Sequence, residues 1–187
     1  MKKAILYILT MFLIGCNPNK QLLEQNVKHY RADGGAYLLY DMQRDEMTDK
    51  QSVNFNLQQK YQPNFSLIGL KGKITPEQLL REYVGIVKNN SDLLTVLRQN
   101  VLSGEAKKAQ VNGVEVFGMT TTTNKNQTKE VITTFLGHFI KGENTYVILV
   151  LLDNPKPIKE TYGFSSAGWN VVNIARDLIT ALTSKKY

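Results

Sequence analysis

The chain has few of the residues that build metal and cofactor sites. Its 187 residues include one cysteine and two histidines, which excludes an internal disulfide framework and a multi-cysteine zinc or iron–sulfur site. We therefore expect no cofactor and no metal. Lysine and arginine total 23 against 16 acidic residues, a net charge of +7. Because these basic residues are spread singly rather than gathered in a block, we expect no nucleic-acid partner.

The N-terminus predicts an export signal that ends in the lone cysteine. Two lysines precede an apolar run at 4–14, which is too short to span a membrane comfortably. The Leu-Ile-Gly-Cys that follows resembles the lipobox of bacterial lipoproteins, in which the cysteine is lipidated and begins the mature chain. We predict a signal peptide over 1–15, lipid attachment at Cys16 and a lipidated polar tether over 16–33. The resemblance implies a membrane-anchored bacterial lipoprotein on the extracytoplasmic, periplasmic face.

The remaining residues, 34–187, predict one α+β domain. A helix is expected from Thr75, which forms a capping box with Gln78, and another from Ser91. An apolar run at 146–152 is typical of a central strand covered on both faces. The order of elements predicts an antiparallel sheet with a C-terminal helix packed on one face. The other expected elements are strands at 36–41, 111–117 and 130–140, a charged turn at 43–50, a loop over 51–61, and a helix over 167–182 with Trp169 inward.

Several segments resemble the motifs of a known enzyme family. They are Asp-Asn-Pro-Lys-Pro at 153–157, Tyr-Gly-Phe-Ser-Ser-Ala-Gly-Trp-Asn at 162–170, Phe-Leu-Gly at 135–137 and Thr-Pro-Glu-Gln-Leu at 75–79. In this order they resemble class B penicillin-binding proteins, in particular the transpeptidase domain of the septal division transpeptidase. Only ten residues separate Pro63 from Ile74, where that family carries its large helical subdomain. The resemblance therefore implies a shortened and degenerate transpeptidase core that lacks this subdomain.

The catalytic motifs of that family are degenerate in this chain. The enzymes need a serine with a lysine one helical turn later, and a Lys-Thr-Gly strand. In the matching segment, Met119 replaces the lysine of this motif and Thr121 replaces its glycine. Thr120 and Thr122 keep the family's hydroxyl groups. Ser66 is one position late for the nucleophile, and no Ser-x-x-Lys occurs in the sequence. We expect these five positions to be vestigial and the protein not to be an enzyme.

The remaining polar candidates are expected to be structural. Ser-Val-Asn at 52–54 has the family's Ser-x-Asn spacing, but it precedes the serine region instead of following it. His138 is expected on the solvent side of its strand, and His29 in the tether. An acidic cluster is expected at a solvated hairpin end rather than in a cation site; it comprises Asp45, Glu46 and Asp49.

Three functions from different classes fit the sequence. The one we favour is a non-catalytic binding or scaffolding module at the cell envelope. Its partners are the membrane, through the lipid anchor, and peptidoglycan or an envelope or division protein. The second is a residual serine transpeptidase or β-lactam-binding protein that uses Ser66, and the third is a decaying duplicate without a defined role. Without the subdomain, an apolar sheet face must either be re-covered or be used as an interface, and we expect a homodimer or a partner on that face.

Overall fold

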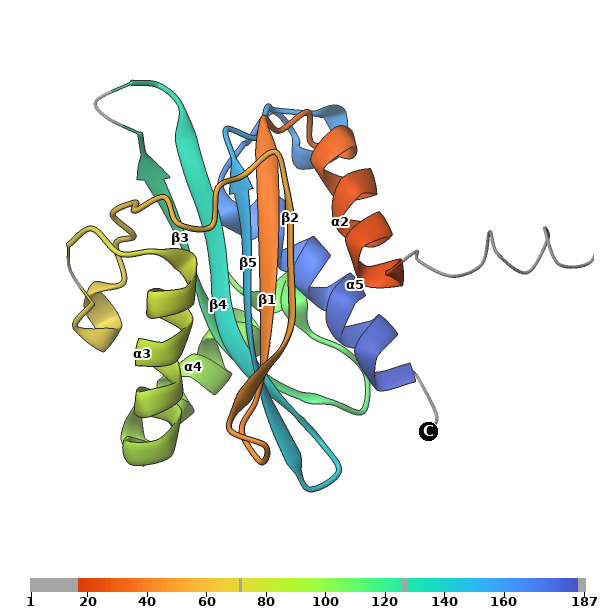
Figure 1. Cartoon of the computed structure of the whole chain (residues 1–187). Helices are drawn as coiled ribbons and strands as arrows, with labels where there is room; N and C mark the ends of the chain where they lie inside the picture. Colours follow the sequence, from red (N-terminus) through yellow and green to blue (C-terminus); the bar gives the residue numbers. More distant parts are fainter. Residues whose placement is uncertain (1–16, 71, 126–127, 185–187) are drawn as a thin grey trace, which may run out of the picture.

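A five-stranded antiparallel sheet forms the centre of the molecule (Figure 1). The structure, a computed structural model, describes residues 17–70, 72–125 and 128–184. The strand order is β2-β1-β5-β4-β3, and every neighbouring pair is antiparallel. The α+β class and the antiparallel sheet predicted from the sequence are thereby confirmed. The strands are β1 (Gly34–Asp41), β2 (Glu46–Val53), β3 (Glu115–Asn124), β4 (Val131–Lys141) and β5 (Asn144–Asp153).

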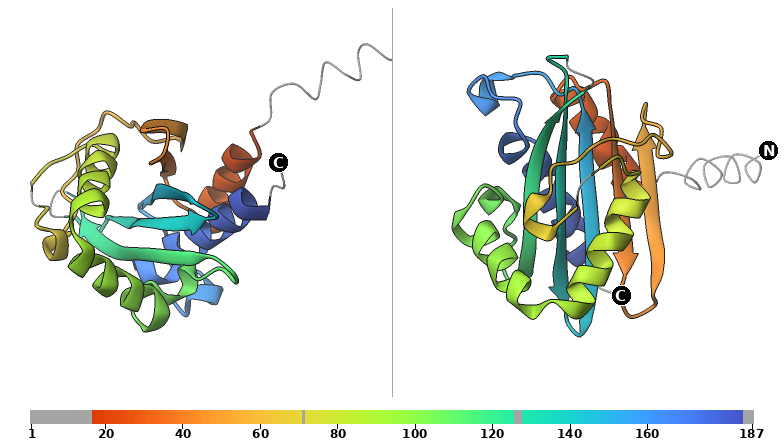
Figure 2. Two further views of the ribbon diagram at one scale, coloured as in Figure 1. Left: turned by 90° about the horizontal axis from the view of Figure 1, so that it is seen from below. Right: turned by 90° about the vertical axis from the view of Figure 1, so that its left-hand side faces the viewer.

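Helices cover both faces of this sheet (Figure 2). The two terminal helices pack on one face, and the helices of the middle of the chain pack on the other. The C-terminal helix thus lies on one face, as predicted. The second face carries helices and the segment 55–70 in the described part of the chain, so it is re-covered, which is one of the two alternatives expected for it. The helices are α2 (Pro18–His29), α3 (Pro76–Asn89), α4 (Ser91–Ser103) and α5 (Val171–Ser184).

The segment expected to be a polar tether over 16–33 is largely helix α2, so this prediction was wrong. Asn17 caps the helix by accepting hydrogen bonds from two backbone N–H groups, and Pro18 occupies its first position, which suits proline because it lacks an N–H. Leu23 and Val27, four residues apart, are buried against the sheet and α5. The folded domain therefore begins near residue 17 rather than at 34. The predicted signal peptide and Cys16 lie outside the described residues.

The sequence prediction of α3 and β5 is confirmed, because both segments have strong local sequence signals. Thr75 and Gln78 form the predicted capping box at the start of α3. The apolar run of β5 lies at the centre of the sheet, with Val147 to Leu152 fully buried between the two helical layers. None of the helices within the described ranges is long and apolar enough to cross a membrane.

Several elements differ from the sequence prediction in their type or in the residue at which they begin. Part of the charged segment 43–50 is β2, an edge strand whose side chains alternate between exposed and half-buried. Asn90, not Ser91, supplies the side chain that caps α4. Strand β3 begins at Glu115 rather than 111, because residues 111–114 form a tight turn. The last helix begins at Val171, because residues 167–169 form a separate 3-10 turn.

The Phe-Leu-Gly motif has a packing role in the sheet. Gly118 on β3 lies directly opposite Gly137 on β4, and the ring of Phe135 lies against both glycines. A Cβ atom built on Gly118 comes within 2.6 Å of this ring, and one built on Gly137 comes within 2.3 Å of the Phe117 carbonyl oxygen. The missing side chains therefore make room for a fully buried aromatic ring.

Candidate functional site

The residues at the family's catalytic strand positions lie on β3, at one edge of the sheet. Their side chains alternate between the two faces, as in any strand. Met119 and Thr121 are both buried, at 5% and 8% exposure, and Met119 belongs to the core under α3 and α4. The Met119 side chain is therefore part of the packed core.

Ser66 lies apart from any activating group. It begins a three-residue 3-10 helix and is exposed, while the preceding Phe65 anchors the segment in the core. Within the described ranges its hydroxyl has no hydrogen-bond partner. Since a serine hydroxyl needs a neighbouring base to become a good nucleophile, this geometry provides no activation.

The outer edge of β3 is divided into a capped half and an open half. In the capped half, Arg98 Nη1 donates to the Val116 carbonyl at 2.8 Å, and Asn100 Nδ2 donates to the Gly118 carbonyl at 2.9 Å. Both side chains come from α4. In the open half, Thr120 donates to Glu105 at 3.3 Å, and Thr122 Oγ1 accepts the Ala167 N–H at 2.9 Å. The two threonines that keep the family's hydroxyls thus tie β3 to the neighbouring loops.

A groove of about 610 Å³ runs along this open half. We call it the β3 groove. One wall is the segment from Gly104 to Lys108, and the other is formed by Ser166 to Trp169. The remaining lining is Asn64 and the threonines of β3. The groove offers hydroxyl, amide, carboxylate and ammonium groups, and it suits a polar ligand with several hydrogen-bonding groups.

An exposed aromatic cluster adjoins the β3 groove. We call Tyr162, Phe164 and Trp169 the aromatic platform. The Phe164 ring stacks on Trp169 with centroids 5.7 Å apart, and the Tyr162 ring meets Trp169 edge-on at 5.4 Å. Lys108 Nζ lies 3.5 Å from the centroid of the Trp169 ring. Burial, together with the charges of Lys107 and Arg176, lowers the pKa of Lys108.

From the sequence, these aromatic residues were predicted only as part of the family motif at 162–170. Trp169 was expected to point inward from a helix. Trp169 is instead half-buried in the 3-10 turn before α5. Three aromatic residues within eight positions, two of them flanking Gly163, were a readable signal for an exposed aromatic loop.

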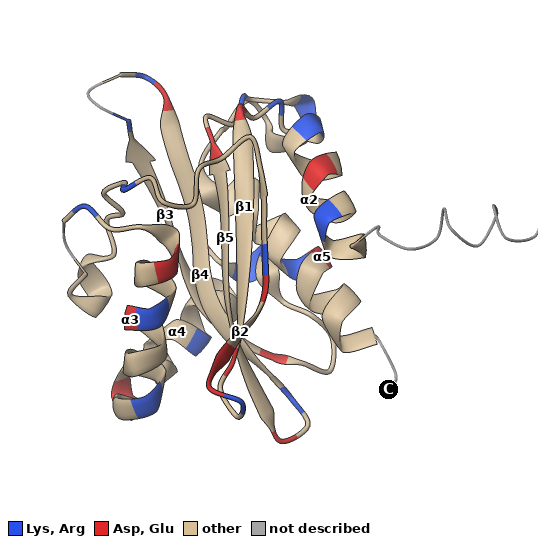
Figure 3. Cartoon of the chain, in the orientation of Figure 1, with Lys and Arg blue, Asp and Glu red and all other residues tan. Residues whose placement is uncertain are grey.

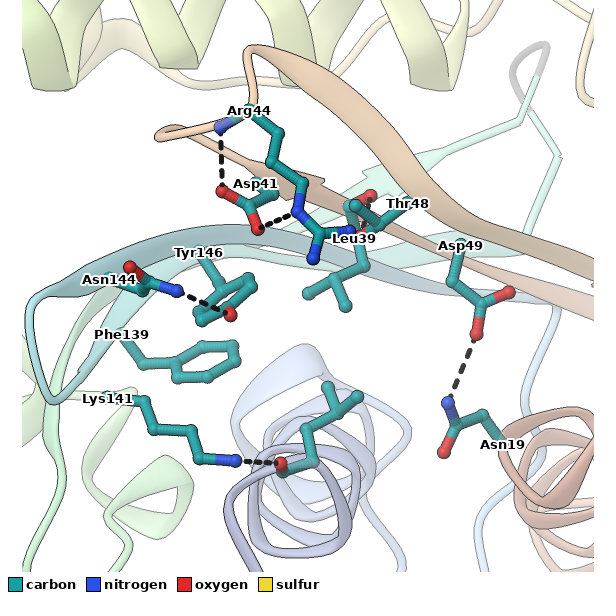
Figure 4. A pocket seen from close by; sticks show the side chains of 11 residues that line it. Asn19, Leu39, Asp41, Arg44, Thr48, Asp49, Phe139, Lys141, Asn144 and Tyr146 are labelled. Atoms are coloured by element: carbon teal, nitrogen blue, oxygen red, sulfur yellow. Dashed lines mark hydrogen bonds and ion pairs between the residues drawn. The ribbon is translucent and has the colours of Figure 1, made fainter. Parts of the chain in front are cut away.

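A second pocket, of about 530 Å³, lies between the sheet and the terminal helices (Figure 4). Phe139 and Tyr146 stack in its wall with centroids 5.3 Å apart. Lys141 Nζ donates to the Leu182 carbonyl at the end of α5 at 3.0 Å. Asp41 lies on the rim, 3.8 Å from Arg44 Nε. This pocket contains none of the positions that the family resemblance singled out.

His138 lies in the core, so its predicted place on the solvent side of β4 was wrong. It is 2% exposed, and its ring stacks on Phe117 with centroids 4.3 Å apart. The distance from His138 Nδ1 to the Tyr83 hydroxyl oxygen is 3.0 Å. Burial lowers the pKa of His138 to about 4 and raises that of Tyr83. At neutral pH both groups are therefore uncharged and share one hydrogen bond, and His138 is a core residue rather than a site residue.

The acidic cluster of the first hairpin does not converge on one point. Asp45 Oδ1 pairs with Lys88 at 2.6 Å and accepts the Tyr40 hydroxyl at 2.8 Å, and the Lys88 bond lowers the pKa of Asp45. Asp49 accepts hydrogen bonds from Tyr37 and from Asn19 Nδ2. Over the described residues, no three His, Cys, Asp or Glu side chains gather as metal ligands.

Basic and acidic residues alternate along α2 and α3 in the view of Figure 3.

Comparison with known proteins connects the chain to peptidoglycan transpeptidases. No family model matches the chain. One curated relative is the probable peptidoglycan D,D-transpeptidase FtsI of Caulobacter vibrioides (strain NA1000 / CB15N), which is 32% identical over 94 residues. The match covers 43% of this chain and 16% of the relative, so the chain matches about a sixth of the relative's length.

Solved structures match over most of the described fold. The transpeptidase domain of FtsI4 from Legionella pneumophila aligns with a TM-score of 0.75 and 16% identity, covering 90% of this chain and 97% of that chain. The transpeptidase domain of penicillin-binding protein 3 from Burkholderia pseudomallei aligns with a TM-score of 0.67 and 13% identity, covering 89% and 93%. The extended-spectrum β-lactamase TLA-3 aligns with a TM-score of 0.54.

These likenesses establish the fold. The protein has the α+β fold of a penicillin-binding transpeptidase domain, in a shortened form. Within that class, the solved structures include FtsI and penicillin-binding protein 3 domains, and the curated relative is also an FtsI. The resemblance inferred from the sequence motifs is confirmed.

Proposed function

We propose that this protein is a non-catalytic module of the bacterial cell envelope that binds peptidoglycan through the β3 groove. In this proposal a lipid on Cys16 holds it on the extracytoplasmic face of a membrane. The observation that carries the proposal is the burial of Met119 and Thr121 beside an open polar groove. The fold keeps a place for a ligand, but position 119 of β3 is a methionine instead of the family's lysine, and Ser66 has no base beside it among the described residues.

The similarity to a peptidoglycan transpeptidase supports the choice of ligand. Transpeptidases bind the polymer that they cross-link, and loss of catalytic groups leaves binding surfaces in place. Because one fold supports many functions, the choice of ligand depends on the groove and its residues. Thr120, Glu105 and Asn64 present hydrogen-bonding groups along the groove, as recognition of a hydroxyl- and amide-rich polymer requires.

Consistent folding supports a retained role over a decaying duplicate. The capping box of α3 is intact, and both core clusters are closely packed. Within the described ranges, only two buried side-chain polar atoms, Asn19 Oδ1 and Thr133 Oγ1, have no hydrogen-bond partner. Agreement between local signals and global packing is the mark of a sequence selected to fold.

Penicillin is expected to leave the protein unmodified. A β-lactam acylates an activated serine, and Ser66 has no base within hydrogen-bonding distance. Intact-mass measurement after incubation with benzylpenicillin should therefore show no adduct in the wild type or in Ser66→Ala. The control is a cooperative melting transition in both proteins. An adduct that disappears in Ser66→Ala would establish a residual β-lactam-binding site and overturn the non-catalytic proposal.

Purified peptidoglycan sacculi are expected to sediment the protein. The interaction should be weakened at least about fivefold by Thr122→Val combined with Asn64→Ala, because these changes remove hydrogen-bonding groups from the groove. The matched control is Thr95→Val on α4, which is exposed away from the groove. A wild-type chain that stays in the supernatant at all protein concentrations would refute peptidoglycan binding.

A further inference from the structure

The aromatic platform contains the two most exposed large hydrophobic side chains of the described residues. Tyr162 is 78% exposed and Phe164 is 55% exposed. Trp169 is already covered by Phe164 and by Lys108, so Tyr162 and Phe164 offer the ring faces that are open to a ligand. Exposed aromatic rings that lie beside a groove are typical of a binding surface rather than of a folding requirement.

The backbone conformation of Tyr162 also supports a binding role for the platform. Its φ of 50° and ψ of 32° are left-handed, a conformation that is rare and costly for a bulky residue other than glycine. The Tyr162 side chain gains little burial in return. Strain of this kind is found at functional sites, where the surrounding structure holds it in place.

Hydrogen bonds hold the platform loop in one conformation. Thr161, which is 2% exposed, binds the Ile158 backbone through its hydroxyl in both directions, at 3.2 and 3.0 Å. Asn170, which is 1% exposed, donates to the Ser165 carbonyl at 2.9 Å. Because the loop is already ordered, a ligand can stack on its rings without a large loss of conformational entropy.

We propose that the aromatic platform binds the sugar rings of a glycan strand, and that the adjoining β3 groove receives its polar substituents. This inference rests on the proposed function and names the part of the polymer that is recognised. A pyranose ring presents C–H groups on its face and hydroxyl groups on its edge. The platform matches the face, while Ser166 and the threonines of the groove match the edge.

The charges beside the platform favour a glycan that bears carboxylates over an apolar protein partner. Lys107 and Lys108 line the groove at the platform end, and Glu105 is the one carboxylate among its lining residues. An apolar partner would have to desolvate the Lys108 ammonium, which costs free energy. A peptide-substituted glycan instead brings carboxylates that complement both lysines.

The platform is tested with the purified full-length chain and two probes, in calorimetric titrations. The first probe is the neutral β-1,4-linked pentamer of N-acetylglucosamine, and the second is a muramyl peptide without further sugars. We expect Tyr162→Asn and Phe164→Ala each to weaken binding of the pentamer at least about fivefold, the loss expected for one stacked ring. Val96→Ala is the control, because it removes a comparably exposed apolar side chain from α4; it should change the affinity less than about twofold.

Thermal stability separates a ligand role from a structural one. Asparagine tolerates the left-handed conformation that strains tyrosine, so Tyr162→Asn is expected to melt at the same temperature as the wild type or higher. Weaker glycan binding without loss of stability is the expected signature. A destabilised Tyr162→Asn that binds the pentamer normally would assign the ring a structural role and overturn the inference.

The remaining outcomes separate this inference from the proposed function. If sacculi sediment the wild type but the pentamer does not bind, or binds equally to both ring variants, the platform inference is wrong and peptidoglycan binding stands. If the muramyl peptide alone binds, recognition lies in the peptide and the inference is again wrong. If the pentamer binds through the rings but sacculi do not sediment the protein, glycan recognition stands and the peptidoglycan proposal falls.

Discussion

Removal of residues 17–33 is expected to unfold the domain. This segment buries Leu23, Val27 and Tyr30 against the sheet and α5. Each such side chain contributes about 1.5–3 kcal/mol when fully buried, and a domain of this size is stable by only about 5–15 kcal/mol. The segment also provides polar anchors, since the Tyr30 carbonyl accepts the Lys156 N–H at 2.9 Å and Asp33 accepts Asn154 Nδ2 at 2.7 Å.

Urea unfolding followed by circular dichroism measures this effect. Chain 17–187 should give a cooperative transition, whereas chain 34–187 should give none or one at much lower urea. Leu23→Asp should lower the free energy of unfolding by several kcal/mol, because it buries a charge without a partner. Lys20→Asp on the exposed face of α2 is the control. A chain 34–187 as stable as 17–187 would show that α2 is dispensable, as a tether would be.

Acid is expected to destabilise the protein through His138. The folded-state pKa of about 4 lies below the ordinary value of 6.5. Between these two values the unfolded chain binds a proton that the folded chain does not, so stability falls as the pH is lowered from 6.5 towards 4. Since one pKa unit corresponds to about 1.4 kcal/mol, the full loss is about 3 kcal/mol. The contribution is fully present above pH 6.5.

The free energy of unfolding between pH 7 and 5 isolates this effect, because most carboxylates remain ionised there. His138→Gln should flatten the pH dependence in this range, since glutamine does not titrate and can still accept the Tyr83 hydroxyl. His29→Gln is the matched control variant, because it replaces an exposed histidine outside the core. An equal slope in the wild type and His138→Gln would mean that His138 takes up its proton over the same pH range in the folded and unfolded chains, which would contradict the lowered pKa.

Local signals decided which elements could be predicted from the sequence. The Thr75 capping box and the apolar run of β5 agree with their tertiary surroundings, so α3 and β5 were placed correctly. Helix α2 was missed because most of its residues are polar and only Leu23 and Val27 mark its buried face. Asn17 and Pro18, which cap its start, were readable signals for a helix rather than a tether.

The candidate site was predictable in its positions but not in its surroundings. The resemblance placed Met119 and Thr121 at the positions of the family's Lys-Thr-Gly motif, but which core they face depends on how α3 and α4 pack over the sheet. The same packing buries His138, whose neighbours Tyr83 and Phe117 come from other elements. The aromatic platform depends on the fold of the 158–170 loop, which no periodic pattern encodes.

The capped edge of β3 also governs how the protein behaves at high concentration. A bare edge strand invites pairing with the edge of another copy and thereby promotes aggregation. Arg98 and Asn100 occupy the outward carbonyl groups of Val116 and Gly118, which leaves only the short stretch around Thr120 and Thr122 open. The outer edge of β3 therefore offers few free backbone groups for pairing with the edge strand of a second copy.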